Sequence, residues 1–253
     1  MRRWGASPTR LATLLATLLV FVLHHPPATA AGFDLRWDAC AADGGVANKN
    51  FACDTDDGTH TMVASFILDQ PITGLFAADV VLDLIVGGNQ PVPAWWDFND
   101  CRLFALSADA TFNPASVNCS DWYGGQGGAA MSSYTSAGTI AAADSASHRR
   151  MTVISGVNPP VNLSPGQDYF LFNLVLVHSA TVDPGACAGC TVPVCIVLNS
   201  IRFLNSSFQE LASMSSPVTP GSNFATWQGG AGANCLSVPA RRTTWGAVKS
   251  LYR

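Results

Sequence analysis

Charged residues are scarce in this sequence. They make up 12% of its 253 residues, with one glutamate, Glu210, and two lysines, Lys49 and Lys249. Glutamate and lysine are common on exposed helix faces, so their scarcity argues against long surface helices. The few basic residues form nothing larger than an arginine pair, whereas nucleic-acid binding requires a clustered basic patch. We therefore expect no nucleic-acid partner.

The familiar catalytic motifs are also missing. The sequence contains no G-x-S-x-G, no H-E-x-x-H and no Walker phosphate-binding loop. Glycoside hydrolysis needs two carboxylates, and with a single glutamate such an enzyme would have to use aspartates. The candidates are Asp97, Asp100 and Asp121. We predict a non-catalytic binding or structural module, with an extracellular glycoside-type hydrolase as the alternative, and we assign no catalytic residue.

Long apolar runs are lacking except at the N-terminus. Three arginines precede the apolar stretch 11–23, and Ala28-Thr-Ala30 follows it. This order is typical of a signal peptide, and the run is shorter than the roughly 20 residues of a membrane-spanning helix. We predict a signal peptide at residues 1–30 and a secreted or cell-surface protein with no transmembrane span. Removal of the signal peptide would take the formal net charge of the chain from −4 to about −7, because the peptide contains three arginines and no acidic residue.

The sequence does contain strand-like segments. Residues 168–178 and 194–204 are rich in β-branched and aromatic side chains and are bounded by Pro, Gly and Asp, as buried strands are. Alternating apolar residues predict further strands at 33–37 and 79–86, and apolar segments of strand length predict others at 60–68, 101–106 and 149–154. Residues 113–147 lack a clear period, and the alternatives there are a mobile insertion and a short helix at 129–136. A loop is expected from 206 to 232.

These elements predict one all-β domain over residues 31–240. We expect a single two-sheet β-sandwich of jelly-roll or immunoglobulin/cohesin-like type with little helix. The C-terminal tail, residues 241–253, carries apolar side chains at helical spacing behind a threonine, which predicts one or two helical turns.

Eight cysteines lie beyond the predicted signal peptide: Cys40, Cys53, Cys101, Cys119, Cys187, Cys190, Cys195 and Cys235. An even number in an exported chain is typical of disulfide bonding. Short loops favour Cys40–Cys53 and Cys101–Cys119, with the last four pairing among themselves. The last four also have the spacing of a four-thiolate zinc site, although export favours disulfides.

Four aromatic residues lie on predicted loops. They are Trp95, Trp96, Trp122 and Tyr123. Exposed planar rings stack on the apolar faces of sugars, which makes these residues candidate ligand-binding residues and an extracellular glycan the first candidate partner, with a surface protein as another. The alternative is that the rings close the end of the hydrophobic core. Both interpretations are open.

One acidic turn has the composition of a cation site. Asp54, Asp56 and Asp57 precede Gly58, and Ca²⁺ prefers several oxygen ligands on a turning loop. The spacing differs from an EF-hand loop, in which a third acid would come one place later and a glutamate would end the motif. Calcium at these three aspartates is the one cofactor considered, with a solvated turn as the alternative.

Three stretches resemble uncharacterised exported bacterial β-sandwich proteins. They are Pro93-Ala-Trp-Trp96, Cys187-x-Gly-Cys190-x-x-Pro-Val-Cys195 and the tail Thr244-Trp-Gly-x-Val-Lys-Ser-Leu-Tyr-Arg253. The similarity covers most of the chain after the leader and implies a bacterial exported origin, but those proteins have no assigned activity. Residues 163–172 are similar to the start of a strand in cohesin-type sandwiches, which bears on fold and not on function.

Overall fold

The structure is a computed structural model that describes residues 31–87, 90–136, 146–230 and 235. The predicted signal peptide and the predicted helical turns of the tail lie outside these residues. Within the described ranges, none of the helices has the length and apolar character needed to cross a membrane.

Strands dominate the described chain. They are β1 (Gly32–Trp37), β2 (Asn48–Lys49), β3 (Thr59–Ile67), β4 (Ile72–Val86), β5 (Leu106–Asp109), β6 (Cys119–Ser120), β7 (Gly127–Ser136), β8 (His148–Leu163), β9 (Asp168–Val177), β10 (Val194–Leu204), β11 (Glu210–Met214) and β12 (Phe224–Trp227). Single turns of 3₁₀-helix lie at η1 (Ala41–Asp43), η3 (Ala94–Trp96) and η5 (Gln228–Gly230).

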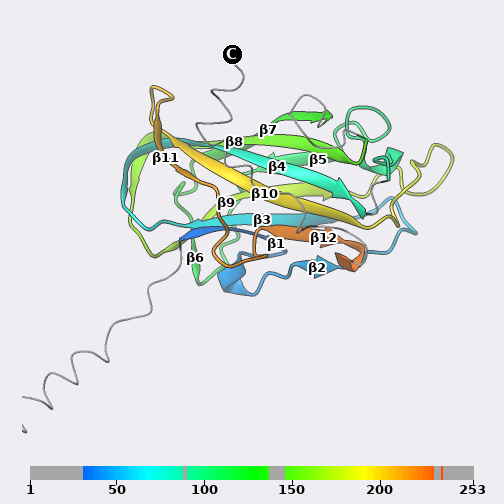
Figure 1. The fold of residues 1–253 in the computed structure, drawn as a ribbon, viewed down its shortest axis with the longest axis horizontal. Helices are drawn as coiled ribbons and strands as arrows, with labels where there is room; N and C mark the ends of the chain where they lie inside the picture. Colours follow the sequence, from blue (N-terminus) through cyan, green and yellow to red (C-terminus); the bar gives the residue numbers. More distant parts are fainter. Residues whose placement is uncertain (1–30, 88–89, 137–145, 231–234, 236–253) are drawn as a thin grey trace, which may run out of the picture.

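The strands form two sheets that pack against each other (Figure 1). The first sheet has the order β1-β3-β9-β5, with β6 also paired to β9. The second has the order β2-β12-β10-β4-β8-β7, with β11 also paired to β10. Side chains of both sheets meet in one core, as where the rings of Phe66 on β3 and Phe203 on β10 lie 4.9 Å apart. The predicted two-sheet β-sandwich with little helix is confirmed.

The strongest strand predictions are confirmed because their apolar residues are those that the core buries. β9 and β10 match the two predicted core strands, and each lies inside its own sheet. On β4, Val80, Leu82 and Leu84 are fully buried on one face, as the period of two requires.

Three local predictions are wrong. Residues 101–105 form a turn and not a strand, because Arg102 enters the core and Phe104 has φ of +66°. Residues 129–136 belong to β7 and not to a helix, since they pair with β8; cross-strand pairing here overrides the weak strand preference of Gly, Ala and Ser. The predicted loop 206–232 contains β11 and β12.

All eight cysteines form disulfides, but the predicted Cys40–Cys53 and Cys101–Cys119 bonds are wrong, and of the last four only Cys195 and Cys235 bond each other. The bonds are Cys40–Cys119, Cys53–Cys190, Cys101–Cys187 and Cys195–Cys235. Each short loop is tied to a segment distant in sequence, at separations of 40 to 137 residues, instead of being closed on itself. The zinc alternative is also wrong, because Cys187, Cys190 and Cys195 each bond a different partner.

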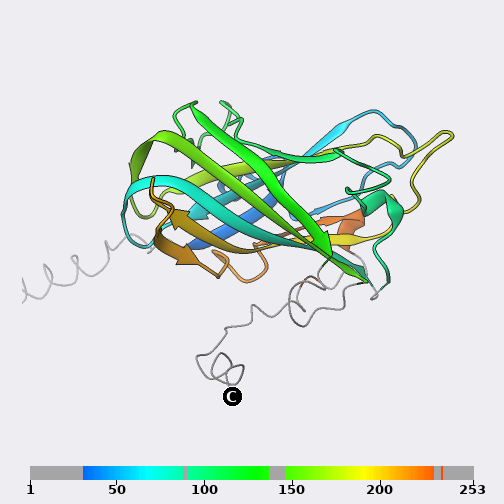
Figure 2. The ribbon, with the colours of Figure 1, turned by 90° about the horizontal axis from the view of Figure 1, so that it is seen from above.

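β5 and β7 are edge strands on the same side of the sandwich. Each ends the strand order of its sheet, and Figure 1 shows both at the upper side of the molecule. Figure 2 views this side directly, with β7 as the bright green strand. Two surface hollows lie between the facing edges of these strands.

Candidate functional site

The four aromatic residues singled out in the sequence are buried. Trp95 and Trp96 are fully buried, and Trp122 and Tyr123 are nearly so. The expectation that their rings form an exposed ligand platform is therefore wrong, and the alternative, that they close the core, describes the structure. Burial is stabilised by packing between rings, as in the 4.9 Å contact between Trp95 and Trp96.

Trp95 belongs to an aromatic cluster around the Cys53–Cys190 disulfide. The ring of Trp227 lies 4.9 Å from that of Trp95, and its indole N–H donates to the carbonyl of Cys190. His178 Nε2 lies 3.8 Å from Cys190 Sγ. A ligand atom from each of Cys53, His178 and Cys190 lies within 4.8 Å of the others, but both sulfurs are in the disulfide, so no thiolate is present to bind a metal.

Arg102 anchors the turn 101–105 to this cluster. Its side chain is buried, with the guanidinium 3.5 Å from the centroid of the Trp95 ring. It donates to the carbonyls of Trp95 and Ser179, both at 2.9 Å, and to that of Val177. Burial lowers the pKa of Arg102 to about 10, so it remains charged at neutral pH. The Cys101–Cys187 disulfide fixes the same turn from the neighbouring residue.

This anchored turn holds two apolar side chains in solvent. Leu103 is 56% exposed and Phe104 is 84% exposed. The φ of +66° at Phe104 lies in a region that bulky residues rarely adopt, which is typical of functional loops whose surroundings enforce the conformation. An exposed aromatic ring on a rigid turn is the kind of group that binds a ligand without an ordering cost.

The first hollow between β5 and β7 opens beside Phe104. It has a volume of about 510 Å³ and is lined by Phe98, Asn99, Leu103, Phe104, Leu106, Ser107, Ala108, Ala130, Met131, Ser132, Ser133 and Tyr134. Phe98 and Tyr134 form a buried floor, with their rings 5.2 Å apart. Asn99, Ser107 and Ser132 provide exposed amide and hydroxyl groups at the rim.

A second hollow continues along the same two strands. It has a volume of about 540 Å³ and is lined by Asp109, Ala110, Thr111, Phe112, Asp121, Gly125, Gly127, Gly128 and Ala129. We call the two hollows together the β5–β7 groove. Both volumes are in the range of small-molecule sites. No lysine or arginine of the described chain lines the groove, and Asp109 and Asp121 are its acidic residues.

The aspartates considered for hydrolysis mostly serve as backbone acceptors. Asp97 Oδ1 accepts the N–H of Asn99 at 3.1 Å, and both carboxylate oxygens of Asp121 accept backbone N–H groups. Asp100 is exposed. Asp121 lines the second hollow of the groove, while Asp97 and Asp100 line neither. The geometry gives no support to a carboxylate pair at these positions, and hydrolysis stays an alternative prediction.

The acidic turn of residues 54–57 does not gather its carboxylates. Among the residues that the structure describes, no cluster of three candidate ligand atoms includes Asp54, Asp56 or Asp57. Asp56 Oδ1 accepts the backbone N–H of Val182 at 2.9 Å and that of Thr181, and these two bonds lower its pKa. Calcium binding at this turn stays a prediction without support from the geometry.

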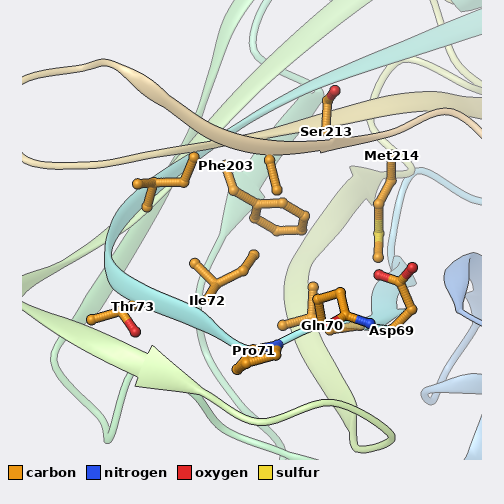
Figure 3. A pocket seen from close by; sticks show the side chains of 11 residues that line it. Asp69, Gln70, Pro71, Ile72, Thr73, Phe203, Ser213 and Met214 are labelled. Atoms are coloured by element: carbon orange, nitrogen blue, oxygen red, sulfur yellow. The ribbon is translucent and has the colours of Figure 1, made fainter.

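A smaller hollow lies between the turn 68–73 and β11 (Figure 3). Its volume is about 220 Å³. Ile72 and Phe203 line it as buried side chains of the core, so it offers no exposed ring comparable to Phe104. The β5–β7 groove is therefore the better candidate site.

Sequence reasoning missed the residues that define the groove. Phe104 and Arg102 fall in the segment 101–106, whose apolar run resembles a strand. The signal that could have distinguished it is the charged residue among apolar neighbours, next to a cysteine. Comparison of the chain with protein-family models, curated proteins and solved structures finds no match, so the assignment of a function depends on this geometry.

Proposed function

We propose that the protein is an exported, non-catalytic binding module whose β5–β7 groove binds an extended, uncharged glycan. The observation that carries the proposal is Phe104, an 84% exposed ring held in a left-handed conformation at the mouth of the groove. Four disulfides favour an oxidising compartment, where such ligands are found.

The chemistry of the lining favours a neutral, hydroxyl-rich ligand. Phe104 supplies a flat apolar surface for a sugar face, and Asn99, Ser107 and Ser132 supply donors and acceptors for hydroxyl groups. An anionic polymer would face Asp109 and Asp121 with no basic side chain among the lining residues. The hollows lie end to end along β5 and β7, which favours a chain over a single small ring.

The test is binding of the purified, oxidised protein to a glycan array, followed by titration calorimetry with the best ligand. Phe104→Ala removes the exposed ring, and we expect affinity to fall about 10- to 30-fold, as for a central aromatic contact residue. The matched control is Phe208→Ala. Phe208 is also exposed, at 67%, and also has a positive φ, but it lies on the turn between β10 and β11.

Three outcomes would contradict the proposal. One is that no neutral glycan binds. Another is equal loss of affinity in Phe104→Ala and Phe208→Ala, which would indicate non-specific contact with exposed phenylalanine. The third is hydrolysis of the bound glycan, which would favour the hydrolase alternative.

A further inference from the structure

Three polar side chains are buried together on the outer face of the first sheet. Asp34 on β1 lies directly opposite Ser65 on β3, and Asp168 on β9 lies opposite Ile67, two residues along β3 from Ser65. Opposite residues, and residues two apart on one strand, share a face, so all three point to the same side. Their exposed fractions are only 4% for Asp34, 0% for Ser65 and 6% for Asp168.

A disulfide-linked cover excludes water from this face. Cys40 precedes η1 and bonds to Cys119, which lies opposite Asp168 in the β6–β9 pair. The Asp43 carboxylate of η1 accepts the backbone N–H groups of residues 117–119 and so joins the two halves of the cover. The outer face of the sheet is therefore an interior site.

Each of the three side chains has an oxygen without a partner. Asp34 Oδ1, Ser65 Oγ and Asp168 Oδ1 are buried and make no hydrogen bond of ordinary geometry among the described residues. Ser222 near Asp34, and Ser65 and the Ala42 backbone near Asp168, still partly offset the effect of burial on the pKa values of the two carboxyls. Buried polar atoms normally have a protein, water or ion partner, because an unpaired one costs about 1–3 kcal/mol. Three such oxygens from three neighbouring strands point to a shared ligand.

The charge of the cluster is also uncompensated. No lysine, arginine or histidine of the described chain forms an ion pair with Asp34 or Asp168. Arg36 attracts Asp34, but its guanidinium donates to the carbonyls of Leu35 and Phe224. Burial raises the pKa of both carboxyls, that of Asp168 to about 6, and the negative charge of Asp34 adds to the second shift. A cation bound between the two carboxyls would favour their ionised forms at neutral pH and offset the repulsion between them.

We propose that Asp34, Ser65 and Asp168 bind a Ca²⁺ ion. The donors of these three side chains are all oxygens. Zinc prefers nitrogen and sulfur ligands, so the site favours a hard cation instead. Two carboxylates balance the double charge. Ca²⁺ accepts irregular sets of carboxylate, carbonyl and water oxygens, whereas Mg²⁺ demands octahedral geometry and releases its waters reluctantly. The bound ion links β1, β3 and β9 beneath the cover.

The test compares thermal unfolding of the oxidised protein at pH 7.5 in EDTA with unfolding after dialysis into excess CaCl₂. At 100 times the dissociation constant we expect Tm to rise by about 5–10 °C, because the ion binds only the folded chain. Titration calorimetry should give one Ca²⁺ per chain, and MgCl₂ should give a smaller Tm shift.

Asp168→Asn and Ser65→Ala are the site variants. The first removes a charge and the second only a hydroxyl, so one of them should fold even if the other does not. We expect the Ca²⁺-dependent shift to be lost in Asp168→Asn and reduced in Ser65→Ala. The control is Asp57→Asn, an exposed aspartate in the acidic turn first considered for calcium, which should keep the full shift.

Several results would overturn the proposal. The absence of stoichiometric Ca²⁺ binding by the unaltered protein suffices, whatever the variants do. A shift that survives in Asp168→Asn, or that disappears in Asp57→Asn, would place the ion elsewhere. A protein that is indifferent to Ca²⁺ but gains stability as the pH falls towards 5 would show that the two carboxyls share a proton instead.

Discussion

Two buried carboxylate sites, one on each sheet, differ in what neutralises them. On the second sheet, Asp83 of β4 lies opposite Arg150 of β8, whose Nε and Nη2 donate to its two oxygens at 2.7 and 2.9 Å. On the first sheet, Asp34 and Asp168 are 4% and 6% exposed, and no lysine, arginine or histidine of the described chain forms an ion pair with either. Both sites carry aspartates on strands, yet only one contains its own counter-ion.

The difference teaches how each sheet tolerates a buried acid. The Arg150–Asp83 pair is bidentate and complete within the chain, so its stability depends little on the medium. The Asp34–Asp168 pair depends on what the medium supplies, protons at low pH or a cation at neutral pH. Three experiments sharpen this comparison.

The largest effect is expected from Arg150→Met. This change leaves the Asp83 carboxylate, whose side chain is 6% exposed, without a partner. The free energy of unfolding should fall by about 3–5 kcal/mol, measured by urea denaturation at pH 7. Adding Asp83→Asn in the same chain should restore much of the loss. A loss of less than about 1 kcal/mol in Arg150→Met would contradict the claim that Arg150 neutralises the buried Asp83 carboxylate.

A smaller effect is expected from pH, measured in EDTA. The pKa of Asp168 rises from 3.8 in the unfolded chain to about 6 in the folded one. Between these values the unfolded chain loses the proton and the folded chain keeps it, so stability falls as the pH rises from about 4 to 6. The loss should reach up to about 3 kcal/mol and be complete above pH 6.

The control for that measurement is Asp168→Asn, which cannot titrate. The difference in unfolding free energy between this variant and the unaltered protein reports the contribution of Asp168. Other acids, such as Asp43 and Asp56, have lowered pKa values, so their effects on stability fall below pH 4. A pH-independent difference would contradict the uncompensated burial of Asp168.

The smallest effect is expected from Arg202→Met. Arg202 pairs with Asp79 across β10 and β4, with 2.7 Å between Nη2 and Oδ2, but its side chain is 53% exposed. Exposed pairs contribute little because water and salt screen them, so the loss should stay below about 1 kcal/mol and vanish in 1 M salt. A loss equal to that of Arg150→Met would mean that burial does not distinguish the two pairs.

The sequence predicted the two-sheet fold because its strongest signals are local. β9 and β10 were found almost to the residue, since β-branched and aromatic runs of this length are buried in any sandwich. The partner of Cys53 could not be predicted, because eight cysteines allow 105 pairings and the true one spans 137 residues.

The candidate sites were predicted poorly for the same reason. The segment around Phe104 is an apolar run of strand length, and the burial of Arg102 against Trp95 leaves Phe104 facing solvent. The alternation of residues 33–37 places Asp34 on the face of the sheet that points away from the core, where an exposed side chain would be expected. Its burial is due to a cover contributed by distant residues, and no local pattern contains that information.

The long span of the cross-links has a consequence for biosynthesis. As the chain grows from its N-terminus, Cys40 and Cys53 appear long before Cys119 and Cys190, their partners 79 and 137 residues later. Until then the thiols available to each are non-native partners, first each other and later Cys101, so a wrong bond can form first. Where a wrong bond has formed, maturation to the native set requires thiol–disulfide exchange after most of the polypeptide has been made.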